Sequence, residues 1–460
     1  MGADESDRRL GGGGGALTAR RALVVPAVPS FSVDGGFRYG VAAGMDGLAI
    51  GSLVRVPLGG RRVRGFVIDL DDGPVEDLKP IAAQSGDRPV FDVGLLETLR
   101  WAALHYVSPL STMLERAAPP NNPQRIRSAA VDFAVKVPGF DEIVEAGASS
   151  RRTPPIVVLA PRPPIEKIAG TAARLLEAGR STLVVTATVH EAESLFDELG
   201  TVLPGAAVVA HGDMADRSIT GAWNRAQSPV VLVGTPRIAA WQVARVGAGF
   251  VIEEGRRAMK DRQTPTLHVR ELLRARAQRE RFPLVVVGPT PTTEILALGP
   301  RMIRSVNGRL WGHVEVIDRR VESSGSGVLT DPVRRALAAV SRRGGRTFVF
   351  GHRRGYAAAS RCVACKSLRR CPGCGSRPDP GEVCIRCGAS LGGCTECGRT
   401  RFEPLGAGVG RLVAEVSRIA DSVEAAPSDA AVVVGTERDV LDLPMMDLVV
   451  VPDMDGLLGG

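Results

Sequence analysis

The chain has 460 residues, 44% of them hydrophobic, and its 58 basic and 50 acidic residues give a formal net charge of +8. This length and composition predict about three domains with buried cores. The chain has no run of about 18 apolar residues, which excludes a membrane-spanning helix, and its modest positive charge favours a polyanionic partner without requiring one.

The N-terminal part is predicted to be a short tail followed by a β-rich domain. Residues 1–24 are charged and glycine-rich, which predicts a disordered tail, and they lack the apolar core of a signal peptide. From Ala27 to Leu70, the stretches SLVRVPLGG and RRVRGFVIDL are typical of two strands joined by a tight turn with arginines at its tip. The stretch FDVGLLETLRWAALHYV then predicts a helix that packs on this sheet.

The rest of the chain has the pattern of parallel sheets covered by helices. A bridge rich in Pro, Asn and Arg spans residues 119–154. Apolar stretches such as PIVVLA, STLVVTAT and FPLVVVGPTP then alternate with helical ones, which favours parallel strands buried on both faces. A second block of this kind starts at RTFVFGHRRGY and resumes at DAAVVVGTE and MDLVVVPDMDGLL. We therefore predict two successive α/β lobes, the second with an insertion.

The insertion holds all eight cysteines of the chain, arranged as four CxxC pairs between Cys362 and Cys397. A CxxC pair places two thiolates on one tight turn, and two such pairs complete one tetrahedral zinc site. In three pairs a glycine follows the second cysteine and allows a positive φ there. Disulfides are the alternative, but without a signal peptide a reducing cytoplasm favours thiolates and hence two structural zinc ions. Spacing leaves sequential, interleaved and nested pairing open, although the nine residues GSRPDPGEV contain a turn that would fold the middle two pairs onto one ion.

Two successive α/β lobes are typical of a helicase motor, and here the chain resembles the PriA family (primosomal protein N-prime), the replication restart DNA helicases. The resemblance rests on FRYGVAAGMDGLAIGSLVRVPLGGRRVRGFV, DRQTPTLHVRELLRARA, HRRGYAAASRCVAC, VVVGTE and VVVPDMDGLL, which occur in the family's order. The junction of Arg-Arg-Gly-Tyr with the first cysteine pair is the most specific of these stretches. The resemblance implies two RecA-like helicase lobes with parallel sheets, an N-terminal mostly-β domain that grips a 3′ DNA end, and a paired-zinc insertion.

The resemblance also implies boundaries and ligands. The expected parts are the tail 1–24, the DNA-binding domain 25–118, the linker 119–154, a degenerate first lobe 155–330, and a second lobe 331–460 with the zinc insertion 361–400. The linker looks too short for the family's winged helix, and the chain stops before the family's last helicase motif, as expected of a fragment or a shortened form. The implied zinc pairing is nested. One ion would be held by Cys362, Cys365, Cys394 and Cys397, and the other by Cys371, Cys374, Cys384 and Cys387.

The residues that ATP chemistry needs are missing, so we predict neither catalytic nor nucleotide-binding residues. The first strand of the first lobe leads into VVLAPRPPIEKIAG, which lacks the glycine-rich phosphate loop, and its three prolines remove N–H donors. Lys167 has no glycine loop before it and is expected at the surface. The acidic box reads FVIEEGRR, with Ile252 where the family has Asp and Gly255 where it has His. Glu253 and Glu254 survive, but without a phosphate loop they have little to activate.

DNA contacts are predicted in the N-terminal domain. Phe37, Gly59 and Lys79 stand at the family's 3′-end pocket, whereas Arg38 replaces an Asp and cannot accept a hydrogen bond from a 3′-hydroxyl. Arginines around the turn offer sequence-independent phosphate contacts, with a merely solvated turn as the alternative: Arg55, Arg61, Arg62 and Arg64. The insertion adds seven basic against three acidic residues. Aromatic residues make up 4% of the chain, so base stacking is expected to be sparse, with Phe37 and Tyr39 as candidates that are equally suited to a core.

The resemblance, together with the missing ATP motifs, implies a replication restart protein of the cytoplasm and nucleoid that binds branched or forked DNA and promotes primosome assembly and loading of the replicative helicase, without ATPase or helicase activity of its own. Its expected partners are forked DNA, primosome proteins and the replicative helicase, and its expected cofactors are two structural Zn²⁺ ions, with ATP doubtful. Two alternatives remain. One is an active ATP-dependent 3′–5′ DNA helicase with divergent motifs, and the other is a zinc scaffold that binds proteins.

Overall fold

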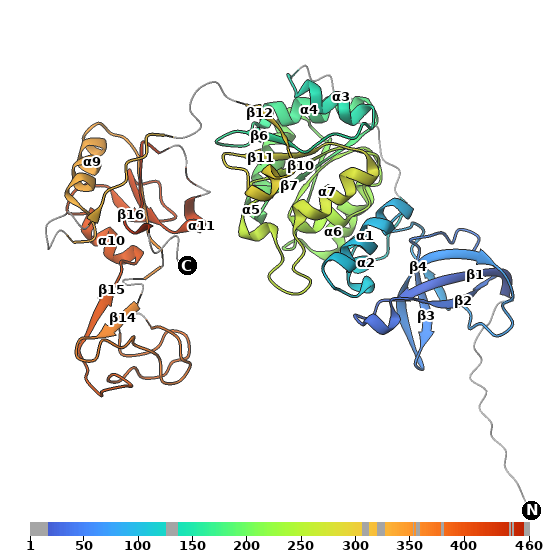
Figure 1. Ribbon diagram of the computed structural model, residues 1–460, viewed down its shortest axis with the longest axis horizontal. Coiled ribbons are helices and arrows are strands. Elements are labelled where there is room, and N and C mark those ends of the chain that lie inside the picture. Colours follow the sequence, from blue (N-terminus) through green and yellow to red (C-terminus); the bar gives the residue numbers. More distant parts are fainter. Residues whose placement is uncertain are drawn as a thin grey trace, which may run out of the picture. The chain divides into compact units, whose positions relative to one another are not determined.

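The computed structural model describes residues 17–125, 137–305, 312–319, 327–352, 354–355, 359–378, 381–440, 443 and 446–454 (Figure 1). Several sequence predictions fall partly outside this set. They are the first 16 residues of the tail, residues 126–136 of the linker, Arg353 and Tyr356 of the junction, residues 379–380 of the turn between cysteine pairs, and the last six residues. The chain divides into two compact units, Met1–His313 and Val314–Gly460. No helix among the described residues is long and apolar enough to cross a lipid bilayer.

The first unit begins with a five-stranded antiparallel sheet in the order β2-β1-β4-β3-β5. Its strands are β1 (Leu17–Pro26), β2 (Phe37–Ala42), β3 (Leu53–Leu58), β4 (Arg61–Asp72) and β5 (Ala83–Ser85), with the 3₁₀ turn η1 (Phe31–Val33) after β1. The segment that leads into β5 also returns to the far edge, because Gly40 N donates to Lys79 O over 3.0 Å and Ile81 N donates to Gly40 O. The segment around Lys79 and β5 thereby links β2 with β3 and curls the sheet toward a barrel.

The boundary predicted for the disordered tail is wrong for the residues that can be described. β1 begins at Leu17, inside the predicted tail, and pairs with both β2 and β4. Ala22 and Val24 are fully buried, so the apolar residues of β1 pack into a core and stabilise the strand. The glycine-rich composition of the preceding residues does not reveal this core.

Two helices connect this sheet to the rest of the unit. α1 (Val93–His105) starts at Asp92, whose side chain accepts a hydrogen bond from Leu95 N, and α2 (Leu110–Ala117) follows it. Phe66 of β4 and Leu99 of α1 belong to the same hydrophobic cluster as Trp223 and Trp241 of the next sheet's helical cover. Trp223 is fully buried and donates its indole N–H to Ala117 O at 3.0 Å. A continuous core therefore joins the β-rich domain to the second sheet of this unit.

A seven-stranded parallel sheet forms the centre of the first unit, in the order β12-β6-β11-β10-β7-β9-β8. The strands are β6 (Ile156–Leu159), β7 (Ser181–Val185), β8 (Ala207–Ala210), β9 (Val231–Gly234), β10 (Val246–Ile252), β11 (Leu284–Gly288) and β12 (Arg301–Arg304). The helices are α3 (Asp141–Ala148), α4 (Ile165–Glu177), α5 (Val189–Val202), α6 (Asp216–Arg225), α7 (Val269–Glu280) and α8 (Thr293–Leu296), with 3₁₀ turns η2 (Pro236–Ala240) and η3 (Arg257–Met259).

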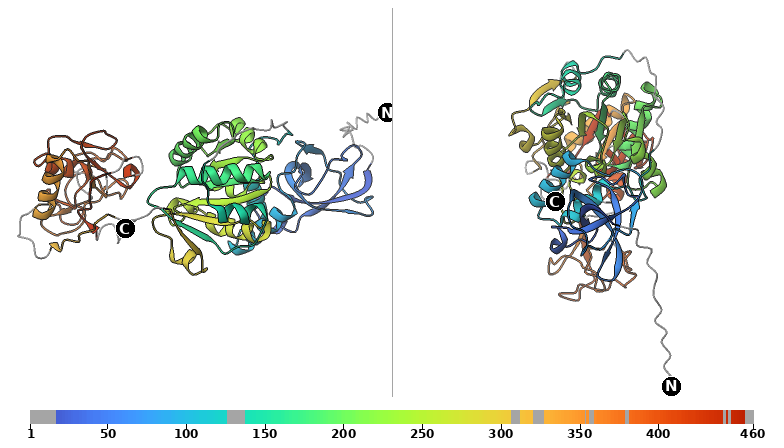
Figure 2. Two further views of the ribbon diagram at one scale, coloured as in Figure 1. Left: turned by 90° about the horizontal axis from the view of Figure 1, so that it is seen from above. Right: turned by 90° about the vertical axis from the view of Figure 1, so that its right-hand side faces the viewer.

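Helices cover both faces of this sheet (Figure 2), which explains why its strands are continuously apolar. Along β7, Leu183 and Val185 belong to one hydrophobic cluster and Val184 to the other. α3 lies within the segment predicted as a linker, and its buried Ile143 packs in the second cluster. The short apolar face of α3, four buried residues in eight, is too brief a signal to separate from a bridge by sequence pattern alone.

The second unit holds a four-stranded parallel sheet in the order β16-β17-β13-β18. Its strands are β13 (Thr347–Phe350), β16 (Val423–Ala425), β17 (Val432–Gly435) and β18 (Leu448–Val450), and its helices are α9 (Asp331–Arg342), α10 (Val409–Val416) and α11 (Glu437–Val440). The cysteine segment leaves and re-enters through a separate antiparallel pair, β14 (Ala359–Cys362) and β15 (Phe402–Leu405). The predicted fold class is confirmed in its architecture: an antiparallel β domain, two parallel α/β sheets, and a cysteine-rich insertion within the second.

Candidate functional site

The β3–β4 hairpin presents two exposed arginines. Leu58 and Arg61 pair across a two-residue turn of Gly59 and Gly60, both with positive φ (55° and 79°), as a tight type I′ turn requires. Arg61 and Arg62 come directly after this turn and are exposed, and neither forms an ion pair with another described residue. The turn thus projects two guanidiniums into solvent on a backbone that glycine alone accommodates readily.

Arg64, predicted with them, has a different environment. Its guanidinium donates to Pro119 O at 3.4 Å, lies 3.9 Å from Glu115 of α2 and sits over the Phe66 ring. Burial lowers the pKa of Arg64, with the Glu115 carboxylate acting in the opposite sense. This side chain is committed to the contact between the sheet and α2. Arg55 pairs with Arg64 across the hairpin and is exposed.

Two of the three predicted 3′-end residues, Phe37 and Lys79, lie on β2 and on the segment that pairs with it, whereas Gly59 lies in the β3–β4 turn. Phe37 is 40% exposed, and Lys79 is exposed on the segment that pairs with Gly40. Tyr39 is only 3% exposed and donates its hydroxyl to Pro57 O, near the hairpin turn. Tyr39 is therefore a core residue that ties β2 to the hairpin, and of the two predicted stacking candidates Phe37 is the one that is open to a ligand.

Arg38 forms an ion pair that the sequence did not reveal. Asp71 at the end of β4 accepts from Arg38 Nη1 at 2.7 Å and from Arg21 Nη2 at 2.6 Å. The hydrogen bond from Arg21 holds the pKa of Asp71 below its usual value, and the Arg38 charge adds to this effect. Arg38 thus has a carboxylate beside it. In the sequence, the acidic run DLDD at the end of β4 indicates available carboxylates but not which arginine they bind.

The acidic box lies at the carboxyl end of β10, where its two glutamates are held by arginines. Glu254 is 1% exposed and accepts from Arg270 Nη1 at 2.7 Å and from Thr292 Oγ1 at 2.5 Å. Glu253, with a φ of 49°, lies 3.8 Å from Arg256, which also binds Glu191 of α5. Burial raises the pKa of Glu253, against the Arg256 charge. Sequence reasoning identified both glutamates but missed their partners. Arg256 stands three residues after Glu253 in the box itself, whereas the tertiary fold brings Glu191 to Arg256 and Arg270 to Glu254.

The turn before α4 occupies the place where a phosphate loop would stand. Pro161, Pro163 and Pro164 lie in it, and Pro164 caps α4 without a side-chain hydrogen bond. Lys167 was expected at the surface, but it is half-buried. It donates to Ser305 O at 3.4 Å and lies 5.5 Å from the centre of the Phe140 ring. Its ammonium is thus engaged by groups of the fold.

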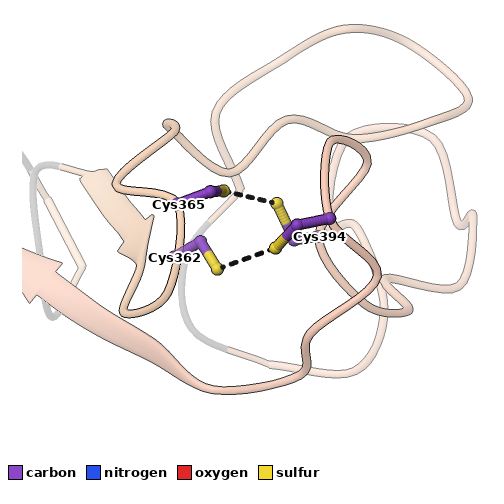
Figure 3. A group of neighbouring side chains, drawn as sticks. Cys362, Cys365 and Cys394 are labelled. Carbon is purple, nitrogen blue, oxygen red and sulfur yellow. Dashed lines mark hydrogen bonds between the residues drawn. The ribbon is translucent and has the colours of Figure 1, made fainter.

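The eight cysteines form two groups of four, with the sulfurs in each group within 4.8 Å of one another. One group is Cys362, Cys365, Cys394 and Cys397, and the other is Cys371, Cys374, Cys384 and Cys387. Figure 3 shows Cys362 and Cys365 facing the loop that carries Cys394. The Sγ atoms of Cys365 and Cys394 lie 3.5 Å apart, and those of Cys374 and Cys384 lie 3.8 Å apart.

These distances fit a shared metal ion. A tetrahedral zinc with Zn–S bonds of about 2.3 Å places its sulfurs about 3.8 Å apart, whereas a disulfide requires about 2.05 Å. All eight thiols are free. The Ser376 hydroxyl lowers the pKa of Cys384 to about 6, and the Ser367 hydroxyl does the same for Cys394. At Cys384 and Cys394 the neighbouring hydroxyl groups thus favour the thiolate form that binds metal, whereas the pKa values of Cys387 and Cys397 are raised to about 12.

Each cysteine pair sits on a turn whose last residue has positive φ. The predicted glycines take this conformation: Gly375, Gly388 and Gly398, with φ of 67°, 74° and 72°. In the first pair Lys366 has φ 62° at the same position, without the freedom of glycine. Around the clusters, Arg361 and Lys366 both bind Glu403 and Arg369 stacks on Phe402, so these three cations are already engaged.

Comparison with known proteins relates the N-terminal residues to a DNA-binding domain. Residues 23–119 match the family model of the PriA 3′ DNA-binding domain. A probable replication restart protein PriA of Mycobacterium leprae is 26% identical over 285 residues, 55% of this chain and 42% of that protein. The replication restart protein PriA of Haemophilus influenzae is 26% identical over 226 residues, 44% of this chain and 30% of that protein. The matched part therefore spans less than half the length of either relative.

Solved structures of DEAD-box proteins resemble the chain at low scores. A DEAD box protein from Methanococcus jannaschii aligns with 68% of this chain and 77% of its own, at a TM-score of 0.32 and 12% identity. Saccharomyces cerevisiae Dbp5 bound to Nup159 and Gle1 aligns with 69% of this chain and 75% of its own, at a TM-score of 0.33 and 10% identity.

Proposed function

Because the chain is a homologue of the PriA replication restart proteins, we propose that it binds branched or forked DNA and promotes primosome assembly and replicative helicase loading at stalled forks. In this proposal the chain acts by binding and recruitment and has no ATP-driven motor of its own. The observation that carries the proposal is the 3′ DNA-binding domain at residues 23–119, with its exposed arginine hairpin.

The N-terminal domain offers contacts of two kinds. Arg61 and Arg62 suit phosphates, because an exposed guanidinium on a fixed turn binds the backbone of any sequence. Phe37 and Lys79 lie along β2 and its paired segment, where an exposed ring suits stacking on a terminal base and an ammonium suits its phosphate. Gly59 keeps the turn tight. Arg64 is left out of this contact set because Glu115 and Pro119 engage it.

The absence of a motor is supported by the charges at the carboxyl end of β10. A nucleotide-binding ATPase holds Mg²⁺ with a carboxylate there and cradles phosphates with glycine N–H groups. Here Arg256 is the cation between Glu253 and Glu191, and Arg270 is the cation beside Glu254. The turn before α4 carries three prolines, which have no N–H to donate. The carboxylates are therefore neutralised within the protein.

We further propose that each cysteine group holds one Zn²⁺ ion with a structural role, since four thiolates close the coordination shell and leave no position for a substrate. When bound, the metal supplies folding free energy to a segment that otherwise has a small hydrophobic cluster of its own. A rigid insertion would serve as a docking module for primosome proteins.

The proposal is tested with the purified zinc-loaded chain and a synthetic fork that has a 3′ end at its branch point. Fork affinity is measured at two salt concentrations, and ATP hydrolysis is measured with and without the fork. We expect tight, salt-dependent fork binding and no hydrolysis above background. DNA-stimulated hydrolysis that Glu253→Gln abolishes would establish the active helicase in place of the loader. Weak binding without salt dependence would instead favour a protein-binding scaffold.

A further inference from the structure

Two adjoining cavities lie at the amino ends of β6 and β11. This is the opposite end of the parallel strands from the acidic box, which follows the carboxyl end of β10. The larger, of about 630 Å³, is lined by Pro155 and Leu284, which stand at the starts of these strands, and by Arg152, Arg274 and Arg279. The smaller, of about 450 Å³, is lined by Ser149, Ser150, Arg151, Arg152 and Arg281. Arg152 belongs to both. We call the two cavities together the arginine cleft.

The cleft carries an excess of positive charge. Arg151, Arg152 and Arg281 are exposed, and none of the three forms an ion pair within the part of the chain that the structure describes. Arg274 pairs with Glu271 at 3.0 Å, and Arg279 donates to Ala275 O of its own helix. The neighbouring carboxylates are already occupied, because Glu280 binds the buried Arg276 through both oxygens and Glu271 also binds Arg270.

The backbone around the cleft is fixed by specific contacts. Arg180 donates to Ser150 Oγ at 2.6 Å and to Ala148 O at 3.3 Å, which holds the chain between α3 and β6. Ser150 and Arg281 have φ of 50° and 60°, a conformation that side-chain-bearing residues keep only where their surroundings hold it. The guanidiniums of Arg151, Arg152 and Arg281 therefore extend from a defined frame.

We propose that the arginine cleft binds the phosphate backbone of a DNA strand, as a contact separate from the N-terminal domain. Arg151, Arg152 and Arg281, which have no ion pair among the described residues, are spread over two cavities beside Arg274 and Arg279. Such a row of guanidiniums matches the repeating phosphates of one strand better than a single phosphate group. No aromatic ring of the described residues lines either cavity, so the cleft has no platform for base stacking and makes sequence-independent contacts. This inference rests on the proposed DNA binding and assigns part of it to the first α/β sheet.

The test uses the full chain, a fluorescent forked DNA and a series of salt concentrations. The double variant Arg152→Gln/Arg281→Gln is compared with a charge-matched control, Arg217→Gln/Arg418→Gln, in which both exposed arginines lie outside the cleft. Removing two phosphate contacts should lower the slope of log affinity against log salt by about 2 in the cleft variant. The control should keep the wild-type slope. Inorganic tripolyphosphate is added in a competition arm to separate a DNA strand from a small anion.

The outcomes separate this inference from the proposed function. If the wild type binds the fork and the cleft variant keeps its affinity and slope, the inference is wrong while the proposed function stands. If the wild type does not bind the fork at all, the proposed function fails first. Tripolyphosphate binding that needs Arg152 and Arg281, with unchanged fork binding, would assign the cleft to a small anion and overturn the DNA contact.

Discussion

The Glu254 carboxylate and the Arg270 guanidinium form an almost fully buried ion pair, with Oε2 and Nη1 2.7 Å apart and side-chain exposures of 1% and 7%. The other carboxylate oxygen accepts from both the N–H and the hydroxyl of Thr292. The pair thereby joins the end of β10 to α7 and to the start of α8. Both carboxylate oxygens of Glu254, a residue of the stretch FVIEEGRR, are thus engaged by other groups of the fold.

Glu254→Ala should therefore destabilise the first unit strongly. Removing one partner of a buried pair leaves an uncompensated charge and costs about 3–5 kcal/mol, with Glu271 retained as a weaker partner for Arg270. Glu97→Ala removes the same charge from an exposed pair with Arg100 and should cost less than about 1 kcal/mol. Urea unfolding of both variants measures the two costs. Similar values would show that the pair at Glu254 is not structural.

Glu253 should make the fold less stable at neutral pH. Burial raises the pKa of Glu253 above its unfolded value of 4.5, so the folded state holds this proton more tightly than the unfolded state. The stabilisation that proton binding by Glu253 contributes to the folded state is complete below pH 4.5. It is lost as the pH rises through the pKa of Glu253 in the folded state. Glu253→Gln cannot ionise and should exceed the wild type in unfolding free energy at pH 7.5. The difference in unfolding free energy between the variant and the wild type should disappear near pH 4. A difference that does not change with pH would show that ionisation of Glu253 does not destabilise the fold.

The metal content of cysteine variants should report the nested arrangement. Wild type is expected to hold two Zn²⁺ ions, and Cys365→Ser/Cys394→Ser, which alters one group, should keep one of them. Cys365→Ser/Cys371→Ser alters both groups and should hold neither ion tightly. Sequential pairing predicts the reverse result, and interleaved pairing predicts the loss of both ions in both variants. Metal analysis after gel filtration against a chelator distinguishes the three arrangements.

The hairpin arginines should contribute to DNA affinity without contributing to stability. Arg61→Gln/Arg62→Gln removes two exposed charges and should lower the salt slope of fork binding by about 2 while the urea midpoint stays unchanged. Arg64→Gln, from the same strand, should lower the urea midpoint and leave the salt slope unchanged, because Glu115 and Pro119 engage this arginine. A lower salt slope in Arg64→Gln would return this residue to the DNA contact set.

The parts of the structure that depend on local pattern could be predicted from the sequence. The two glycines after Leu58 predicted the turn, and the apolar runs such as LVVVG predicted the parallel strands. The start of β1 could not be predicted, because Ala22 and Val24 are buried only by pairing with strands far along the chain. The pairs Arg270–Glu254 and Arg256–Glu191 could not be predicted for the same reason, because only packing brings their members together, whereas Arg256 lies three residues from Glu253 and that contact is local.

The pair β14 and β15 has a consequence for how the second unit acquired its metal-binding segment. Cys362 and Phe402 pair directly across the two strands, so the segment leaves and returns at one point. The four-stranded sheet beside it has its own core. A single genetic event could therefore add or remove the whole segment as a cassette, and a short loop joining Arg361 to Glu403 should leave the parent fold intact.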